Sequence, residues 1–120
     1  MTDDSPWPKE IRLFKAAGRL EVDFVDGKKF TYPAEYLRVE SPSAELQGHN
    51  GSKTILGGRR YVKIAELEEV GNYAIRIRFD DHHDTGIYSW SYLYELGRNY
   101  DQVWQRYLDA LGEKRLSRDP

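Results

Sequence analysis

The chain has 120 residues, of which 18 are Lys or Arg and 20 are Asp or Glu, so its formal net charge at pH 7 is −2. That balance excludes the general attraction to phosphate groups on which basic nucleic-acid and membrane-surface proteins depend. The sequence has no cysteine, which excludes disulfides and thiolate metal sites and fits a cytoplasmic location, and no stretch approaches the ~20 apolar residues of a membrane span.

The first part of the chain predicts three short antiparallel strands. Apolar side chains recur at every second position over residues 11–13 and again over 20–24, which is typical of half-buried strands. The pair Asp26-Gly27 then predicts a hairpin turn, because glycine adopts positive φ without steric cost. The alternation continues beyond the turn at Phe30 and Tyr32.

Two short helices are expected next. Pro33 fixes φ where a helix over residues 34–38 can begin, and Ser41 is expected to cap a second helix that has Pro42 at its first position. The polar, glycine-rich stretch 48–60, which contains His49, is expected to form a loop.

The second half predicts further strands and two longer helices. Residues 61–64 form a candidate strand, and the alternation over residues 73–79 is the clearest strand pattern in the chain. Cap residues mark the helix ends. The helices are expected at 90–96, between Ser89 and Gly97, and between the cap Asn99 and Gly112.

These elements predict an α+β fold, in which a small antiparallel sheet carries helices packed on one face in two layers. The expected domain covers residues 8–112. It lies between a flexible N-terminal segment, 1–7, and a disordered tail, 113–120, in which a single apolar residue lies among charged ones.

The turn after the strand at 73–79 concentrates ionisable side chains. His82, His83, Asp81 and Asp84 follow one another closely, and imidazole and carboxylate groups suit a divalent metal such as iron or zinc, with water completing the shell. A catalytic His-x-Asp iron triad also needs a distant second histidine, and none follows His83. The alternative is a structural turn in which an aspartate accepts backbone N–H bonds and a histidine packs on an aromatic ring.

The aromatic residues after this turn predict a partner surface. The chain has more Tyr and Trp here than one small core can hide, so Tyr88 and Trp90 are expected to form, together with Arg38, a surface for a partner or ligand. No serine lies in a glycine elbow and no catalytic constellation is complete, so we do not expect an enzyme. A further alternative is a basic strip for nucleic acid, which would consist of Arg59, Arg60, Lys63, Arg76 and Arg78.

Four stretches of the chain carry a family pattern. They are 33–38 (PAEYLR), 41–45 (SPSAE), 70–75 (VGNYAI) and 79–97, the last containing the histidine turn. In this order they resemble the gamma-butyrobetaine hydroxylase-like N-terminal domain family (DUF971), across residues 8–98. The resemblance implies a compact α+β module that occurs alone, as the N-terminal domain of carnitine-synthesis dioxygenases, and fused to iron–sulfur cluster carrier ATPases.

The resemblance also bears on metal binding. In the dioxygenases the domain holds a structural zinc through three cysteines and one histidine, and these positions fall here at Ser41, Ser43, Leu46 and His83. Only the histidine is retained, so that zinc site is not expected in this chain. His82 stands where relatives usually have glycine.

The hypothesis is therefore a non-catalytic accessory module in iron–sulfur or metalloprotein maturation. It binds a partner protein, for which an iron–sulfur carrier ATPase is the candidate, with or without a divalent metal. Neither nucleic acid nor a membrane is expected as a partner. The alternative from another class is a metal-dependent enzyme or oxygenase-associated subunit that uses His82, His83 and Asp84.

Overall fold

The computed structural model describes residues 6–47 and 53–120 and confirms the α+β class. His49 lies outside the described residues. No helix in the described ranges is long and apolar enough to cross a membrane. In chain order the elements are β1 (Pro8–Phe14), β2 (Arg19–Phe24), β3 (Lys29–Pro33), α1 (Ala34–Val39), α2 (Ala44–Gln47), β4 (Ile64–Val70), β5 (Ala74–Phe79), β6 (Gly86–Ser89), α3 (Trp90–Arg98) and α4 (Tyr100–Glu113).

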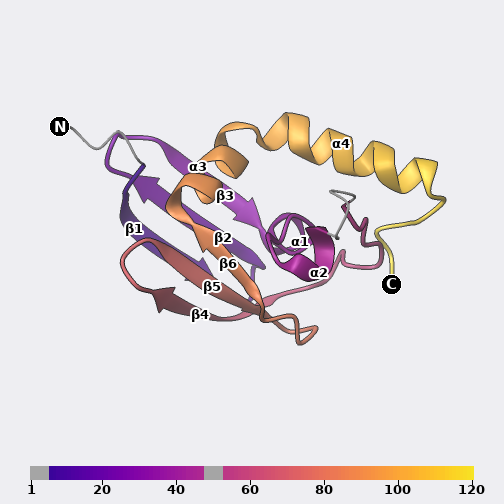
Figure 1. Ribbon diagram of the computed structural model, residues 1–120, viewed down its shortest axis with the longest axis horizontal. Helices are drawn as coiled ribbons and strands as arrows, with labels where there is room; N and C mark the ends of the chain where they lie inside the picture. The colour runs from indigo at the N-terminus through magenta and orange to yellow at the C-terminus, as the bar shows by residue number, and fades with distance from the viewer. Residues whose placement is uncertain (1–5, 48–52) are drawn as a thin grey trace.

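The strands form two antiparallel sheets of three, β1-β2-β3 and β4-β5-β6. The predicted N-terminal meander is thereby confirmed, and Gly18 and Gly27 have φ of 68° and 92° in its turns. Figure 1 shows the strands of both sheets gathered toward one end of the molecule, with α3 and α4 along one side and α1 and α2 beside the ends of the strands. The turn at Phe79–His83 lies close to α1 and α2 in space.

Strand β4 differs from the sequence prediction, which placed a strand at 61–64. The observed strand begins at Ile64 and continues to Val70. Its outward positions carry glutamates that lie opposite arginines of β5, with Glu66 paired to Arg78 and Glu68 to Arg76. An edge strand with charged residues on its solvent face lacks the apolar alternation that identified the other strands.

Buried tyrosines join the sheets to the helices. Tyr32, Tyr36 and Tyr88 are all fully buried in the main core cluster. Tyr32 donates its hydroxyl proton to the carbonyl of Leu93 at 2.6 Å, and Tyr36 does the same to Leu96 at 2.7 Å. Burial of these rings therefore leaves their hydroxyls satisfied, which a polar group in a core requires.

Helix α3 starts where the sequence predicts and ends later. Ser89 accepts the N–H of Tyr92 at 3.1 Å, which confirms the predicted cap. Gly97 lies inside the helix instead of ending it. Glycine is needed at this position because a Cβ there would lie 2.3 Å from Phe30 Cγ. The glycine thus permits close packing of α3 on the first sheet, and Arg98 is the last helical residue.

Helix α4 also passes its predicted end at Gly112. It ends in a Schellman motif, in which the N–H of Leu116 bonds to the carbonyl of Leu111 at 2.9 Å and that of Arg115 to Gly112 at 3.2 Å. Arg115 takes the left-handed position with φ of 56°, where glycine is usual. The motif reverses the chain, so that residues 116–120 return toward α1 (Figure 1).

This return revises the expectation of a disordered tail. The backbone N–H of Gly58 donates to Ser117 at 2.8 Å, and that of Arg60 donates to Arg118 at 3.0 Å. Arg118 further makes an ion pair with Glu35. The segment after α4 is therefore docked on the domain, because its charged side chain has a partner that lies 83 residues earlier in the chain.

Candidate functional site

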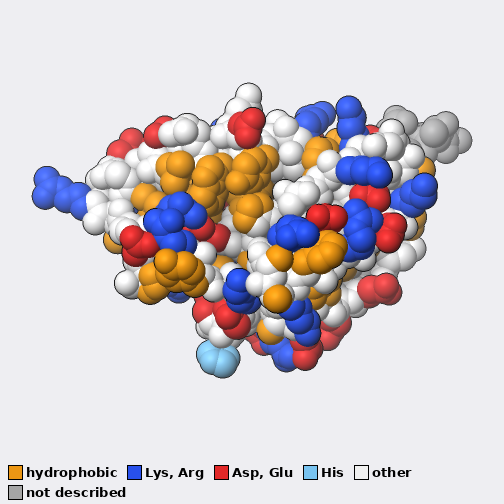
Figure 2. All heavy atoms as spheres, turned by 180° about the vertical axis from the view of Figure 1, so that it is seen from behind, with side chains coloured by type: hydrophobic (Ala, Val, Ile, Leu, Met, Phe, Trp, Pro, Cys, Tyr) orange, Lys and Arg blue, Asp and Glu red, His pale blue; other side chains and the backbone are white. Residues whose placement is uncertain are grey.

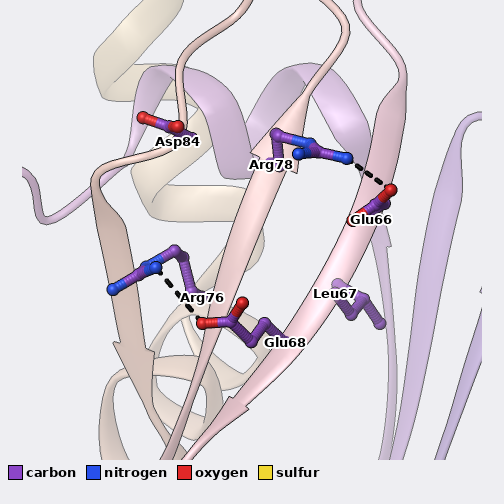
Figure 3. A pocket seen from close by; sticks show the side chains of 6 residues that line it. All are labelled: Glu66, Leu67, Glu68, Arg76, Arg78 and Asp84. Atoms are coloured by element: carbon purple, nitrogen blue, oxygen red, sulfur yellow. Dashed lines mark hydrogen bonds and ion pairs between the residues drawn. The ribbon is translucent and has the colours of Figure 1, made fainter.

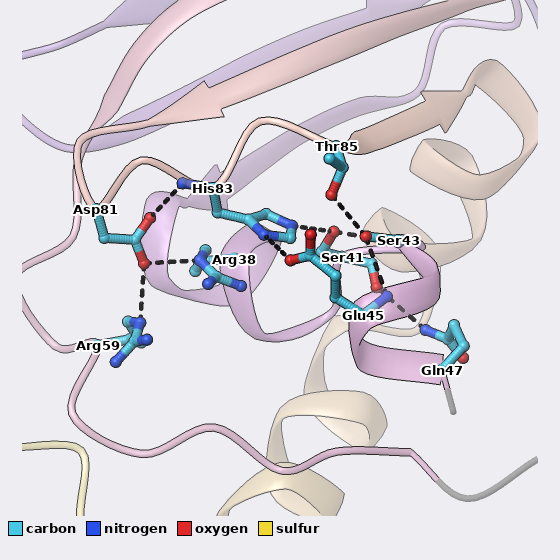
Figure 4. Close-up of polar contacts among 9 residues, drawn as sticks. All are labelled: Arg38, Ser41, Ser43, Glu45, Gln47, Arg59, Asp81, His83 and Thr85. Carbon is cyan, nitrogen blue, oxygen red and sulfur yellow. Dashed lines mark hydrogen bonds and ion pairs between the residues drawn. The ribbon is translucent and has the colours of Figure 1, made fainter. Parts of the chain in front are cut away.

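The turn between β5 and β6 packs against α1 and α2 and forms a cluster of polar contacts with them (Figure 4). Two groups of contacts meet there. One is the serine–histidine network, made of Ser41, Ser43, Glu45, His83 and Thr85. The other is the arginine pair, Arg38 and Arg59, which shares Asp81.

The local backbone sends the two histidines in opposite directions. His82 donates its N–H to Phe79 at 3.1 Å, and Phe79 donates to the carbonyl of His83 at 2.9 Å, which closes a tight turn. His82 has φ of 72° and an exposed side chain. His83 turns inward, and its side chain is only 2% exposed. The two imidazoles therefore do not form one site.

Hydrogen bonds determine the tautomer of His83. Its Nε2 lies 2.9 Å from Ser41 Oγ, and that oxygen already accepts the N–H of Ser43 at 3.3 Å. Its Nδ1 faces Glu45 Oε2 at 3.2 Å, and a carboxylate only accepts, so the ring proton lies on Nδ1. In the neutral ring Nε2 is then the acceptor, and Ser41 donates its hydroxyl proton to it. Burial and the nearby charge of Arg38 lower the pKa of His83 below 6.5, so the neutral form is favoured.

The order serine, histidine, glutamate matches the connectivity of a hydrolytic triad. Access is what it lacks. Ser41 is 0% exposed, and a Cβ on Gly86 would lie 2.5 Å from its Oγ. A substrate carbonyl cannot reach an oxygen enclosed in this way. We therefore interpret the three residues as a structural network.

Asp81 holds the arginine pair together. Its Oδ2 accepts from Arg38 Nε at 2.8 Å and from Arg59 Nε at 2.9 Å, while Oδ1 accepts the N–H of His83 at 3.2 Å. Desolvation opposes ionisation of this carboxyl, but the hydrogen bonds and the two positive charges outweigh it and lower the pKa of Asp81. Asp81 is therefore a structural anion that links α1 to the histidine turn and to the 57–62 segment.

The predicted metal residues do not converge. His83 points inward and His82 is exposed. Asp81 accepts hydrogen bonds from two arginines. Asp84 lies elsewhere, at a shallow hollow of about 70 Å³ on the outer face of the second sheet (Figure 3), where Arg76 and Arg78 lie nearby. Within 6–47 and 53–120, no group of three or more His, Asp or Glu residues could hold a metal ion.

Of the four positions at which the resemblance places zinc ligands, Ser41, Ser43 and His83 are joined by hydrogen bonds: Ser41 bonds to His83 and accepts the backbone N–H of Ser43. The fourth, Leu46, is buried at 2% exposure. Two hydroxyls and a leucine side chain do not fit a tetrahedral zinc, which prefers thiolate and imidazole ligands. Hydrogen bonds hold α2 against the histidine turn in this chain.

Burial corrects the predicted partner surface. Tyr88 is 0% exposed and bonds to the carbonyl of Leu37, Arg38 is 6% exposed, and Trp90 is 9% exposed with its Nε1 bonded to Asn72. Tyr88 on β6 packs against α1, and Arg38 on α1 is held by Asp81. The three predicted residues are not available to a partner in this conformation.

A surface that the sequence did not indicate lies next to the arginine pair. It is an open hollow of about 380 Å³, which we call the 58–62 hollow. Tyr61 is its most prominent side chain, with 69% of its surface exposed. The sequence offers only a tyrosine in a polar stretch as a signal for this surface, and the pattern there predicts a strand over residues 61–64. The hollow is lined by Gly58, Arg59, Tyr61, Val62, Asp80, Asp81 and Pro120.

The arginines of the proposed basic strip are paired with carboxylates. Arg59 bonds to Asp81, Arg60 to Asp119, Arg76 to Glu68 and Arg78 to Glu66. On the face shown in Figure 2, basic and acidic side chains lie interspersed. These pairs remove the excess positive charge on which binding to a phosphate backbone depends.

Comparison with known proteins places these features in a family. The sequence profile described as gamma-butyrobetaine hydroxylase-like, N-terminal matches residues 11–94. Two solution NMR structures superpose with TM-scores of 0.84. One is 41% identical and covers 97% of this chain and 92% of its own, and the other is 42% identical with 100% and 92% covered.

A crystal structure from Acidithiobacillus ferrooxidans is also similar. That protein, of unknown function and from the DUF971 family, is 38% identical over 75% of this chain and 91% of its own, with a TM-score of 0.64. The comparison with curated proteins gives no match.

Proposed function

Because the chain belongs to the gamma-butyrobetaine hydroxylase-like N-terminal family (DUF971), we propose that it is a non-catalytic accessory module that binds a partner protein. The observation that carries this proposal is the 58–62 hollow, which combines an exposed aromatic ring with ionised groups beside a rigid polar network. The candidate partner is an iron–sulfur cluster carrier ATPase. The proposed process is iron–sulfur or metalloprotein maturation in the cytoplasm. The fusion of this family's domain to such ATPases supports this choice.

Tyr61 supplies the anchor of the proposed interface. A tyrosine ring offers a large apolar area and one polar end at low entropic cost, and such residues dominate binding energy when a partner covers them. Arg59 and Asp80 form a polar rim around it, as is typical of partner surfaces. The backbone under Tyr61 is held by Asp80, which accepts the N–H of Lys63 at 3.0 Å.

The polar cluster supports a non-catalytic role. The histidine, serine and aspartate side chains that chemistry would need are engaged with one another, and Ser41 and His83 are buried. His82, His83 and Asp84, which the enzymatic alternative requires as one site, point to different surroundings. A divalent metal stays a prediction without support from the described residues.

Titration of the fluorescently labelled chain with a purified iron–sulfur carrier ATPase tests the proposal. We expect saturable binding that Tyr61→Ala weakens at least ~10-fold, since loss of an aromatic anchor typically costs 2 kcal/mol or more. Tyr73→Ala is the matched control, because Tyr73 is also exposed, at 56%, but lies at the β4–β5 turn. Equal binding of both variants and wild type would contradict the assigned surface, and no binding by wild type would contradict the partner class.

A further inference from the structure

The docked segment after α4 places Arg118 among a set of groups that we call the Arg118 site. It consists of Glu35 on α1, Trp104 on α4 and the backbone of residues 57–60. None of these belongs to the serine–histidine network. In the free chain, Arg118 occupies the site.

The side-chain part of the site is specific for a guanidinium. Arg118 donates from Nε to Glu35 Oε2 at 2.9 Å and from Nη2 to Oε1 at 2.7 Å, a two-pronged pairing that the planar fork of arginine provides and lysine does not. The guanidinium carbon lies 5.2 Å from the centre of the Trp104 ring. The Glu35 side chain is only 6% exposed, so its carboxylate requires a cationic partner.

The backbone part of the site holds the peptide groups on both sides of Arg118. Gly58 and Arg60 donate their N–H groups to the carbonyls of Ser117 and Arg118, which are consecutive residues. Gly57 permits this approach, because a Cβ there would lie 2.6 Å from the carbonyl oxygen of Ser117. The site thus contacts one arginine side chain and the peptide groups on both sides of it.

Beyond these contacts the occupant makes one further ion pair, between Asp119 and Arg60, at an exposed position. Leu116 is 43% exposed, and Ser117 and Asp119 are exposed as well. The turn that delivers the segment has Arg115 in the left-handed region, a conformation that costs a non-glycine residue free energy. Segments with few buried contacts open locally at low cost, so an external arginine can compete for Glu35 and Trp104.

We propose that the Arg118 site is a receptor for an arginine-bearing segment of the partner protein, which displaces residues 116–118. The partner class rests on the proposed function, whereas the chemistry of recognition rests on the Glu35 carboxylate, the Trp104 ring and the two N–H donors. Partner binding then uses two surfaces that share residue Gly58, since the 58–62 hollow adjoins the docked segment.

The test uses the full chain and a fluorescein-labelled peptide with the sequence of residues 114–120, Lys-Arg-Leu-Ser-Arg-Asp-Pro. In wild type the tethered segment competes at an effective concentration that is millimolar for a short linker. Arg118→Ala is therefore expected to bind the peptide at least ~10-fold more tightly than wild type does. Adding Glu35→Gln should reverse that gain.

The peptide supplies a control that does not depend on the folding of any variant. Replacing its second arginine by lysine should weaken binding to the Arg118→Ala chain, and replacing it by alanine should abolish binding. Equal affinity of the three peptides, or equal affinity of wild type and Arg118→Ala, would overturn the proposal. A wild-type dimer in sedimentation that Arg118→Ala dissociates would overturn it as well, because the occupant would then be a second copy. Peptide binding without binding of the carrier ATPase would support the arginine site and refute only the proposed partner class.

Discussion

His83→Ala should destabilise the fold without acting on an exposed surface. The substitution removes a ring whose side chain is 2% exposed and leaves the hydroxyl of Ser41, at 2.9 Å, without its acceptor. A buried donor left unsatisfied costs about 1–3 kcal/mol, and the space left by the ring adds to it, so we expect a loss of about 2–4 kcal/mol in the free energy of unfolding. The contact with Glu45 adds little, because that side chain is 63% exposed.

Urea unfolding followed by circular dichroism measures this loss as a shift in the midpoint. The control is His82→Asn, which alters the neighbouring histidine at an exposed position, and asparagine tolerates the left-handed backbone there. We expect it to stay within about 0.5 kcal/mol of wild type. If His83→Ala also stayed within that range, the serine–histidine network would not be a structural element, and His83 would again be a candidate for direct contact with a ligand.

Three further predictions follow from the same cluster. Because the folded state lowers the pKa of His83 below 6.5, the unfolded state binds more protons below that pH. Wild-type stability should therefore fall as pH decreases from 6.5, and urea midpoints of His83→Ala should lack this component. His82→Gly should raise the free energy of unfolding by up to ~1 kcal/mol, since φ there is 72°; a thermal melt showing no gain would argue against that backbone. Gly86→Ala should cost about 1–3 kcal/mol through the contact of its Cβ with Ser41, and Ser41→Ala in the same chain should recover part of this loss in a double-mutant cycle.

Local patterns in the sequence determined the class of fold and several elements. Strands β2 and β5 were predicted because their inward side chains alternate, and the start of α3 because Ser89 precedes an apolar run. These signals depend on neighbours within four residues, so they can be read without knowing what the segment packs on. The order of motifs also identified the family, which the profile match confirms.

The candidate site could be predicted only in part. The concentration of polar groups after β5 correctly drew attention to the turn, but its two histidines differ in the sign of φ, and that difference arises from the turn at residues 79–83. The contact of Ser41 with His83 joins positions 42 residues apart. No periodicity reports such a contact, because it depends on how α1 and α2 pack against the second sheet.

Tertiary structure alone decided which side chains are accessible and where the chain returns. Trp90, predicted as surface, is buried at 9% exposure, while Tyr61 is left exposed at 69%. Gly97 and Gly112 have the composition of helix ends, yet both lie inside helices. The segment after α4 has the composition of a disordered tail, but Arg118 finds a buried carboxylate at Glu35. A charged side chain is expected in water unless a partner compensates its burial, and a partner 83 residues away is visible only once the chain has folded.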